Sequence, residues 1–178
     1  MGLQTGAELA RTSQAVIDPR TLQIIAYELT GPLLADQPSF LRIADVREFS
    51  DIGLIVDSSD EFVATGDVIK LDEVYKLAFS PTHMPVIDEK RHKLGKVEDY
   101  IIDTSSFVIQ QLSVRRPLLK SLGDTHLLVH RSQITEINNN AIIVHSQAKI
   151  PEPVLSKVSN AYVNPFRKNP QAEHTDRK

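Results

Sequence analysis

The sequence predicts a mainly β protein: two small closed β-barrels in tandem, a short connecting helix between them and a short C-terminal helix. Two observations lead to this fold class. Residues 79–150 repeat the order of segments found in residues 1–66, and the apolar runs in both are short, rich in β-branched side chains and ended by turn formers. Short strands with tight turns avoid exposed sheet edges by closing into a barrel.

The repeat is seen in the order of five segments. Each copy has an apolar pair followed by aspartate, a long apolar-rich strand, a second strand, a polar turn and a short apolar run. In the first copy these are 16–18, 22–29, 40–44, 50–51 and 54–56, and in the second they are 101–103, 107–114, 125–130, 138–140 and 141–144. Because a unit of this size is near the lower limit for independent stability, we expect the two copies to support each other.

A helical connector is predicted at residues 67–78. Val68, Leu71, Tyr75 and Ala78 recur at helical spacing, which gives one apolar stripe. Asp67 is the expected N-cap, because its side chain can accept a hydrogen bond from an amide of the first turn. In the second copy, the run from Pro117 to Gly123 is typical of a single helical turn.

The C-terminal part changes character after Ile150. Val154, Leu155, Val158 and Tyr162 predict a short amphipathic helix at residues 151–163. Residues 164–178 are polar and contain Pro165 and Pro170, so we expect a disordered tail there.

Composition and charge narrow the class of protein. With 41% hydrophobic and 24% charged residues the chain is expected to fold, no apolar run reaches the ~20 residues of a membrane span, and cytoplasmic residence is the expected location. The absence of cysteine excludes disulfides and thiolate sites. Residues 1–78 hold 6 basic and 13 acidic side chains, whereas residues 79–150 hold 9 and 7. Such an asymmetry can steer different partners to the two copies, or reflect nothing more than a solvated surface.

A family resemblance arises in the second copy. The segments Val86–Lys90, Lys93–Tyr100, Ile102-Asp103 and Phe107–Val114 resemble the PRC-barrel family, which includes a domain of the photosynthetic reaction centre and a domain of a ribosome maturation factor. The resemblance covers residues 84–146, and residues 3–57 look like a more degenerate copy. It implies a small closed barrel used as an interaction module, generally without catalysis. Gly95, within this region, fits either a close approach of two backbones or a plain turn.

Enzyme motifs are absent, so neither catalysis nor a cofactor is expected. Four aspartates follow apolar pairs, and the expected role of each is to start a turn by bonding to nearby amides. They are Asp18, Asp57, Asp88 and Asp103. His126, His130 and His145 could in principle converge on zinc, but ordinary surface or hydrogen-bonded histidines are the preferred interpretation.

The predicted interaction patch consists of Arg115, Arg116, Lys120 and Arg131. The arginine pair directly follows a predicted strand, and the other two flank the adjoining loop; a solvated barrel rim is the alternative. Because no aromatic side chains are interleaved with these residues and the net charge is −3, binding to nucleic acid is not expected except through a ribosome.

These observations favour a non-catalytic adaptor or scaffold that binds another protein. The alternative is a ribosome-associated factor, of the ribosome-maturation type, whose second barrel touches ribosomal protein or RNA. The identity of the protein partner and the oligomeric state, including a homo-oligomer, stay open.

Overall fold

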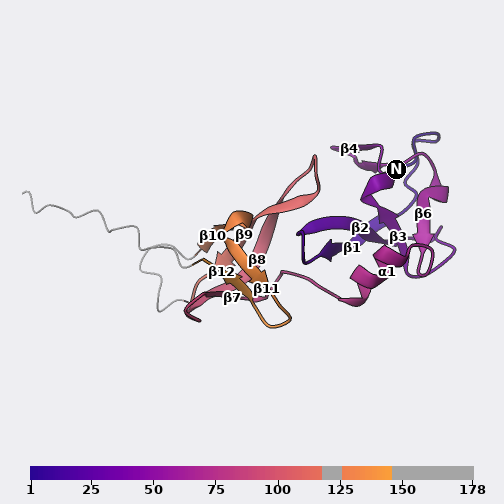
Figure 1. The fold of residues 1–178 in the computed structure, drawn as a ribbon. Helices are drawn as coiled ribbons and strands as arrows, with labels where there is room; N and C mark the ends of the chain where they lie inside the picture. Colours follow the sequence, from indigo (N-terminus) through magenta and orange to yellow (C-terminus); the bar gives the residue numbers. More distant parts are fainter. Residues whose placement is uncertain (118–125, 146–178) are drawn as a thin grey trace, which may run out of the picture. The chain divides into compact units, whose positions relative to one another are not determined.

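Strands are the main regular structure of the protein, as the mainly β prediction expected (Figure 1). The computed structural model describes residues 1–117 and 126–145. The strands of residues 1–78, the first half, are β1 (Arg11–Asp18), β2 (Gln23–Thr30), β3 (Ser39–Arg42), β4 (Glu48–Ser50), β5 (Gly53–Ile55) and β6 (Phe62–Ala64). Those of residues 79–145, the second half, are β7 (Pro85–Asp88), β8 (Lys93–Asp103), β9 (Val108–Arg115), β10 (His126–His130), β11 (Ile134–Ile137) and β12 (Ile142–Val144).

Four short helices accompany these strands in the described ranges. Three are single 3-10 turns, η1 (Ile43–Asp45), η2 (Ser59–Glu61) and η4 (Arg131–Gln133), and the fourth is α1 (Ile69–Lys76). None of the helices in these ranges is long and apolar enough to cross a membrane.

Strand pairing joins the two halves in one ten-stranded sheet. Its order is β11-β12-β7-β8-β9-β2-β3-β6, with β1 beside β2 and β10 beside β9, while β4 and β5 form a separate pair. This differs from the two separate closed barrels that were expected. The ladder crosses between the halves at one bridge, Gln23 opposite Val108, and no pairing among the described strands closes either half.

The long hairpins of the two halves have the same register. Each residue pair of the β1–β2 ladder has a counterpart in the β8–β9 ladder. The offset in sequence is constant and equals the one between Asp18 and Asp103. The matching pairs include Arg11–Thr30 with Lys96–Arg115, Thr12–Leu29 with Val97–Val114, Ala15–Tyr27 with Tyr100–Leu112, and Asp18–Gln23 with Asp103–Val108. Both ladders are also irregular at two corresponding places, so the likeness extends to the bulges.

The short hairpins match as well. A 3-10 turn precedes each of them, η1 before β4 and η4 before β11. The pairs Glu48–Ile55 and Phe49–Leu54 correspond to Glu136–Ile143 and Ile137–Ile142, so Val56 takes the place of Val144.

The largest core belongs to the second half but includes side chains of the first. Val86, Val97, Ile109, Leu112 and other buried residues of the second half form one cluster with Ile17, Leu22 and Ile24. Burial of apolar side chains is the main stabilising term of a fold. The two halves therefore stabilise each other, which their small size led us to expect.

The connector helix is shorter than predicted and packs on the first half. It begins after Val68, whose backbone is extended, and Asp67 is not its cap: that carboxylate accepts a hydrogen bond from the Ala64 amide at 2.7 Å instead. Leu71 and Val74 are buried against β-strand residues of the first half, and α1 contacts β1 (Figure 1). Ala78 is exposed and lies past the helix end with a φ of 46°.

Several predicted elements lie outside the described residues. These are most of the helical turn at 117–123, the helix at 151–163 and the tail at 164–178.

Candidate functional site

The two halves differ at the strand that completes the second half. There β7 pairs in parallel with β12 and antiparallel with β8, and Val86, opposite Ile142 and Gly95, is fully buried. In the first half only one parallel bridge, between Gly2 and Val56, occupies this region. Because Val56 takes the place of Val144, Gly2 takes the place of Asp88. No described residue of the first half lies where Val86 lies in the second.

A groove of about 360 Å³ marks this place in the first half. Its walls include the counterparts of the residues that surround Val86. They are Ala10, Thr12, Leu29, Leu54 and Val56, which correspond to Gly95, Val97, Val114, Ile142 and Val144. The consequence is clearest at one position: Val97 is fully buried, whereas Thr12 is exposed. We call this hollow the open groove.

Three exposed apolar side chains line the open groove or a second hollow that shares Ile52 with it. Leu3, Phe49 and Ile52 are exposed by 62%, 53% and 70%. Ile52, in the turn between β4 and β5, lines the open groove and also a second hollow of about 500 Å³ that Leu3 helps to form. Single exposed apolar residues are normal on a protein surface, but a group beside a hollow is typical of a binding site. We call Leu3, Phe49 and Ile52 the apolar patch.

The rim of these hollows is acidic. Glu48 and Asp51 line the second hollow, and neither forms an ion pair with any residue in the described ranges. Glu8 on the open groove is bound by Arg11 at 2.6 Å, and the hydrogen bond from that guanidinium lowers the pKa of Glu8. The unpaired side-chain charge at the rim is therefore negative, and it lies beside the Met1 ammonium, which donates to the Leu54 carbonyl at 3.0 Å.

Reciprocal hydrogen bonds join the turns of the two long hairpins. The Ile24 amide donates to the Phe107 carbonyl at 2.8 Å, and the Ile109 amide donates to the Leu22 carbonyl at 2.9 Å. Leu22 and Phe107, at corresponding positions, are both buried and have φ values of 58° and 54°. Side chains with a Cβ rarely adopt this left-handed region, so the contact between the turns holds both residues there.

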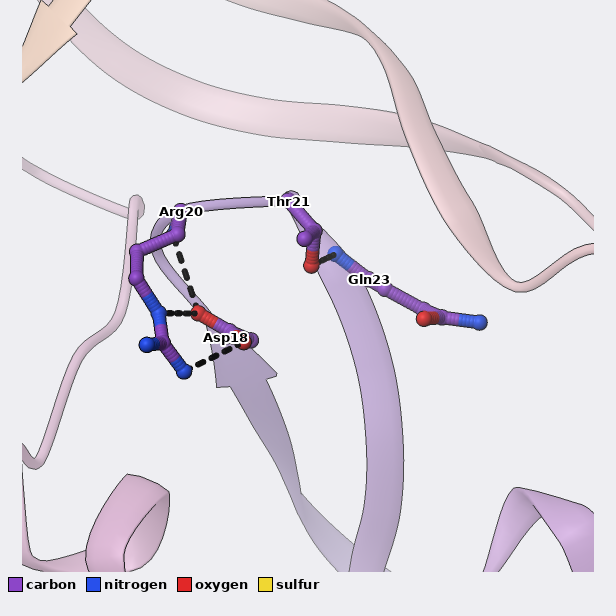
Figure 2. A network of polar contacts seen from close by, with 4 residues as sticks. All are labelled: Asp18, Arg20, Thr21 and Gln23. Carbon is purple, nitrogen blue, oxygen red and sulfur yellow. Dashed lines mark hydrogen bonds and ion pairs between the residues drawn. The ribbon is translucent and has the colours of Figure 1, made fainter. Parts of the chain in front are cut away.

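An aspartate braces each of these turns. Figure 2 shows Arg20 folded back over the end of β1, with its amide at 3.0 Å and its guanidinium at 3.1 Å from the buried Asp18 carboxylate. The Arg20 hydrogen bond lowers the pKa of Asp18. Asp103 accepts from the Ser105 amide at 3.0 Å, and this bond lowers the pKa of Asp103.

The prediction that strand-end aspartates start turns is confirmed for three of the four. Besides Asp18 and Asp103, Asp88 accepts a hydrogen bond from the His92 amide at 2.7 Å. Asp57 differs, because its carboxylate is held by the Arg47 guanidinium at 2.8 Å. All four carboxylates are thus occupied by local structural contacts.

Two residues of the predicted basic patch, Arg115 and Arg131, lie at opposite ends of β10. Arg115 lies opposite His126, at one end of β10, and forms an ion pair with Glu98; Arg116 follows it. Arg131 lies just past the other end of β10, where its guanidinium reaches the Thr21 carbonyl at 3.4 Å. Lys120 lies outside the described residues. The two ends are separated because a whole strand runs between them.

The three histidines considered for zinc have separate partners. His126 contacts Glu98 at 2.6 Å, His130 contacts Ser132 at 2.8 Å, and His145 contacts Glu89 at 2.8 Å. In the part of the chain that the structure describes, no group of three or more histidine, cysteine or carboxylate side chains could hold a metal ion.

Sequence reasoning missed the apolar patch. It treated Ser50-Asp51 as a polar turn and overlooked the isoleucine that follows. Ile52 in a hairpin turn was the available signal, because turns favour small and polar residues.

Comparison with known proteins adds no relative: no protein-family model matches the chain, and no curated protein matches it. The PRC-barrel resemblance accordingly stays a prediction, and the function has to be argued from the surface.

Proposed function

We propose that this chain is a non-catalytic, cytoplasmic adaptor that binds a protein partner through the apolar patch. The observation that carries the proposal is the exposure of Leu3, Phe49 and Ile52 beside two hollows. A few apolar or aromatic anchors at the centre of an interface usually carry most of its binding energy. A polar rim then surrounds them. Phe49 and Ile52 fit the role of anchors, and Glu48 and Asp51 fit the rim.

We further propose that the scaffold is a tandem of two PRC-barrel-like repeats, the first of them degenerate. The matched registers of both pairs of hairpins support this proposal. The region near Val56 is where the first repeat departs from the second, and that is also where the apolar patch lies.

The charged side chains favour an adaptor over a ribosome-bound factor. Binding to phosphates needs a cluster of uncompensated cations. Arg115 is already paired with Glu98, and Arg131 lies at the other end of β10.

The proposal is tested by affinity capture from the native cell with a matched pair of variants. Ile52→Asp places a charge in the apolar patch, while Leu128→Asp places one on β10, at a side chain that is 57% exposed. We expect the wild type and Leu128→Asp to retain the same partner and Ile52→Asp to lose it. Equal capture by all three proteins would refute the assigned surface.

A second arm of the experiment tests the alternative of a ribosome-associated factor. Arg115→Glu and Arg116→Glu are introduced together, and cosedimentation with ribosomes is measured at rising salt. The adaptor proposal predicts no cosedimentation that depends on these arginines. Cosedimentation of the wild type that falls steeply with salt and is lost in the double variant would replace the adaptor with the ribosomal factor.

A further inference from the structure

The surface that joins the two halves is reciprocal. The offset that relates the long hairpins takes Leu22 to Phe107 and Ile24 to Ile109. Each half therefore donates from one of these positions and accepts at the other: the Ile24 amide donates to the Phe107 carbonyl, and the Ile109 amide donates to the Leu22 carbonyl. Equivalent residues that face each other from both sides are typical of a two-fold interface between copies of one protein.

The connector between the halves begins in a strained conformation. Ala78, the second residue after α1, has a φ of 46° although it carries a Cβ. Its amide donates to the Tyr75 carbonyl at 3.0 Å, so it ends the helix in the left-handed conformation that glycine usually supplies. This conformation costs a residue with a Cβ free energy, and the cost is relieved if the chain extends at Ala78.

The next anchored part of the connector belongs to the second half. Pro81 is fully buried, and the His83 amide donates to the Val97 carbonyl at 2.8 Å. Residues 79–80, which lie before this anchor, make no backbone hydrogen bond to another described residue. Residues 78–80 are thus the part of the connector that can change direction while each half keeps its own fold.

We propose that this chain exchanges halves between two copies, so that the first half of each copy pairs with the second half of the other. The proposal does not depend on the adaptor function. Every contact of the joint, including Gln23 opposite Val108, forms again across the dimer, because the two copies supply identical surfaces. Extension at Ala78 relieves its left-handed backbone in both copies. Loss of translational freedom opposes exchange, so the dimer forms at high protein concentration.

The exchanged dimer carries the apolar patch twice. A partner with two binding segments would therefore bind it more tightly than it binds the monomer, without any new contact.

Two substitutions at position 78 test the strain. The association constant of the full chain is measured, after equilibration over a range of concentrations, by size-exclusion chromatography with light scattering. Ala78→Gly removes the cost of the left-handed backbone, and Ala78→Val, which is β-branched, raises it. Because each dimer relaxes two connectors, the constant should fall at least about tenfold in Ala78→Gly and rise at least about tenfold in Ala78→Val. Equal constants would overturn the proposal. If Ala78→Val does not fold, Ala78→Gly against the wild type decides.

His83→Gly is the matched control. His83 also has a positive φ, 69°, but it lies on the second-half side of the hinge, where Val97 holds it. Exchange leaves that contact unchanged, so His83→Gly relaxes the monomer and the dimer alike. Its association constant should stay within about twofold of the wild type. A fall as large as that of Ala78→Gly would show that flexibility of the connector controls the dimer, and would refute the hinge at Ala78.

A disulfide reports which halves are paired. The chain has no cysteine, and Gln23 and Val108 lie opposite each other without a hydrogen bond between them, the kind of pair whose side chains come close enough for a disulfide. Gln23→Cys and Val108→Cys are introduced together, and the isolated dimer is oxidised and run on a denaturing gel without reductant.

An exchanged dimer stays covalently joined on that gel, whereas the monomer fraction closes on itself. A dimer whose chains separate would show association through another surface, and exchange of halves would be rejected. Absence of a dimer in the wild type and in every folded variant would reject it equally.

Discussion

Replacing Gly95 by alanine should force β8 and β9 apart. A Cβ built on Gly95 lies 2.1 Å from the Arg115 carbonyl oxygen and 2.9 Å from Val114 Cγ1. The nearest of these atoms belongs to the backbone of β9, so no change of rotamer relieves the overlap. Close approach of two backbones is thus the reason for glycine at this position, rather than a plain turn.

The expected loss of stability follows from two terms. Overpacking a tight site costs about 1–3 kcal/mol, and weakening a neighbouring ladder hydrogen bond adds about 0.5–1.5 kcal/mol. Alanine restricts the unfolded chain more than glycine does, which offsets about 0.5–1 kcal/mol. With the middle of each range, the net free energy of unfolding should fall by about 2 kcal/mol. At ~2–4 °C per kcal/mol for a chain of this size, the melting temperature should fall by about 4–8 °C.

Ala10, which corresponds to Gly95 and directly precedes β1, provides the control. Urea unfolding followed by circular dichroism should show that Ala10→Gly costs only about 0.5–1 kcal/mol, the usual entropic cost of replacing alanine by glycine. The reasoning is refuted if Gly95→Ala unfolds within about 0.5 kcal/mol of the wild type, or if the two variants lose equal stability.

Two further predictions concern α1 and the first turn. Leu71→Ala should lower the free energy of unfolding by about 2–5 kcal/mol, because the Leu71 side chain is only 3% exposed. Ile69→Ala is the control: its side chain is 77% exposed, so the free energy should change by less than about 0.5 kcal/mol. Equal effects of the two variants in urea melts would contradict the packing of α1. The hydrogen bond from Arg20 lowers the pKa of Asp18 in the folded state. The Asp18 carboxylate therefore stabilises the fold above the unfolded pKa of about 3.9. This stabilisation is lost as the pH falls through the lower folded pKa. Unfolding measured from pH 6 down to about pH 2 should therefore depend less on pH in Asp18→Asn, and an unchanged slope would count against the turn contact.

Local signals in the sequence were sufficient for most of the strands and several of their turns, although β6 was not predicted. Asp18 and Asp103 act as turn formers because an aspartate side chain reaches amides two residues on, which depends only on neighbours. The start of α1 was misplaced for a similarly local reason. The Asp67 carboxylate is used by the preceding turn, at the Ala64 amide, so the expected cap was not available.

Long-range features could not be predicted in the same way. The ladder between the halves depends on Leu22 and Phe107, two buried residues in a conformation that their side chains disfavour, and nothing in the local sequence marks them. Arg115 and Arg131 lie at opposite ends of β10, a separation that their places in the sequence did not indicate. The open groove depends on which strands pair with β1, and a repeat seen only as an order of segments does not reveal strand pairing.

Among the described residues β1 pairs only with β2, whereas β8 pairs with both β7 and β9, and native-state amide exchange tests this difference most directly. Val97 and Thr12 occupy the same position in matching ladders, so their amides form an internal comparison. The account predicts strong protection at Val97, whose amide bonds to Met84, and exchange at Thr12 that is faster by orders of magnitude. Equal protection of the two amides would show that the edge of β1 is already covered, and would contradict the account.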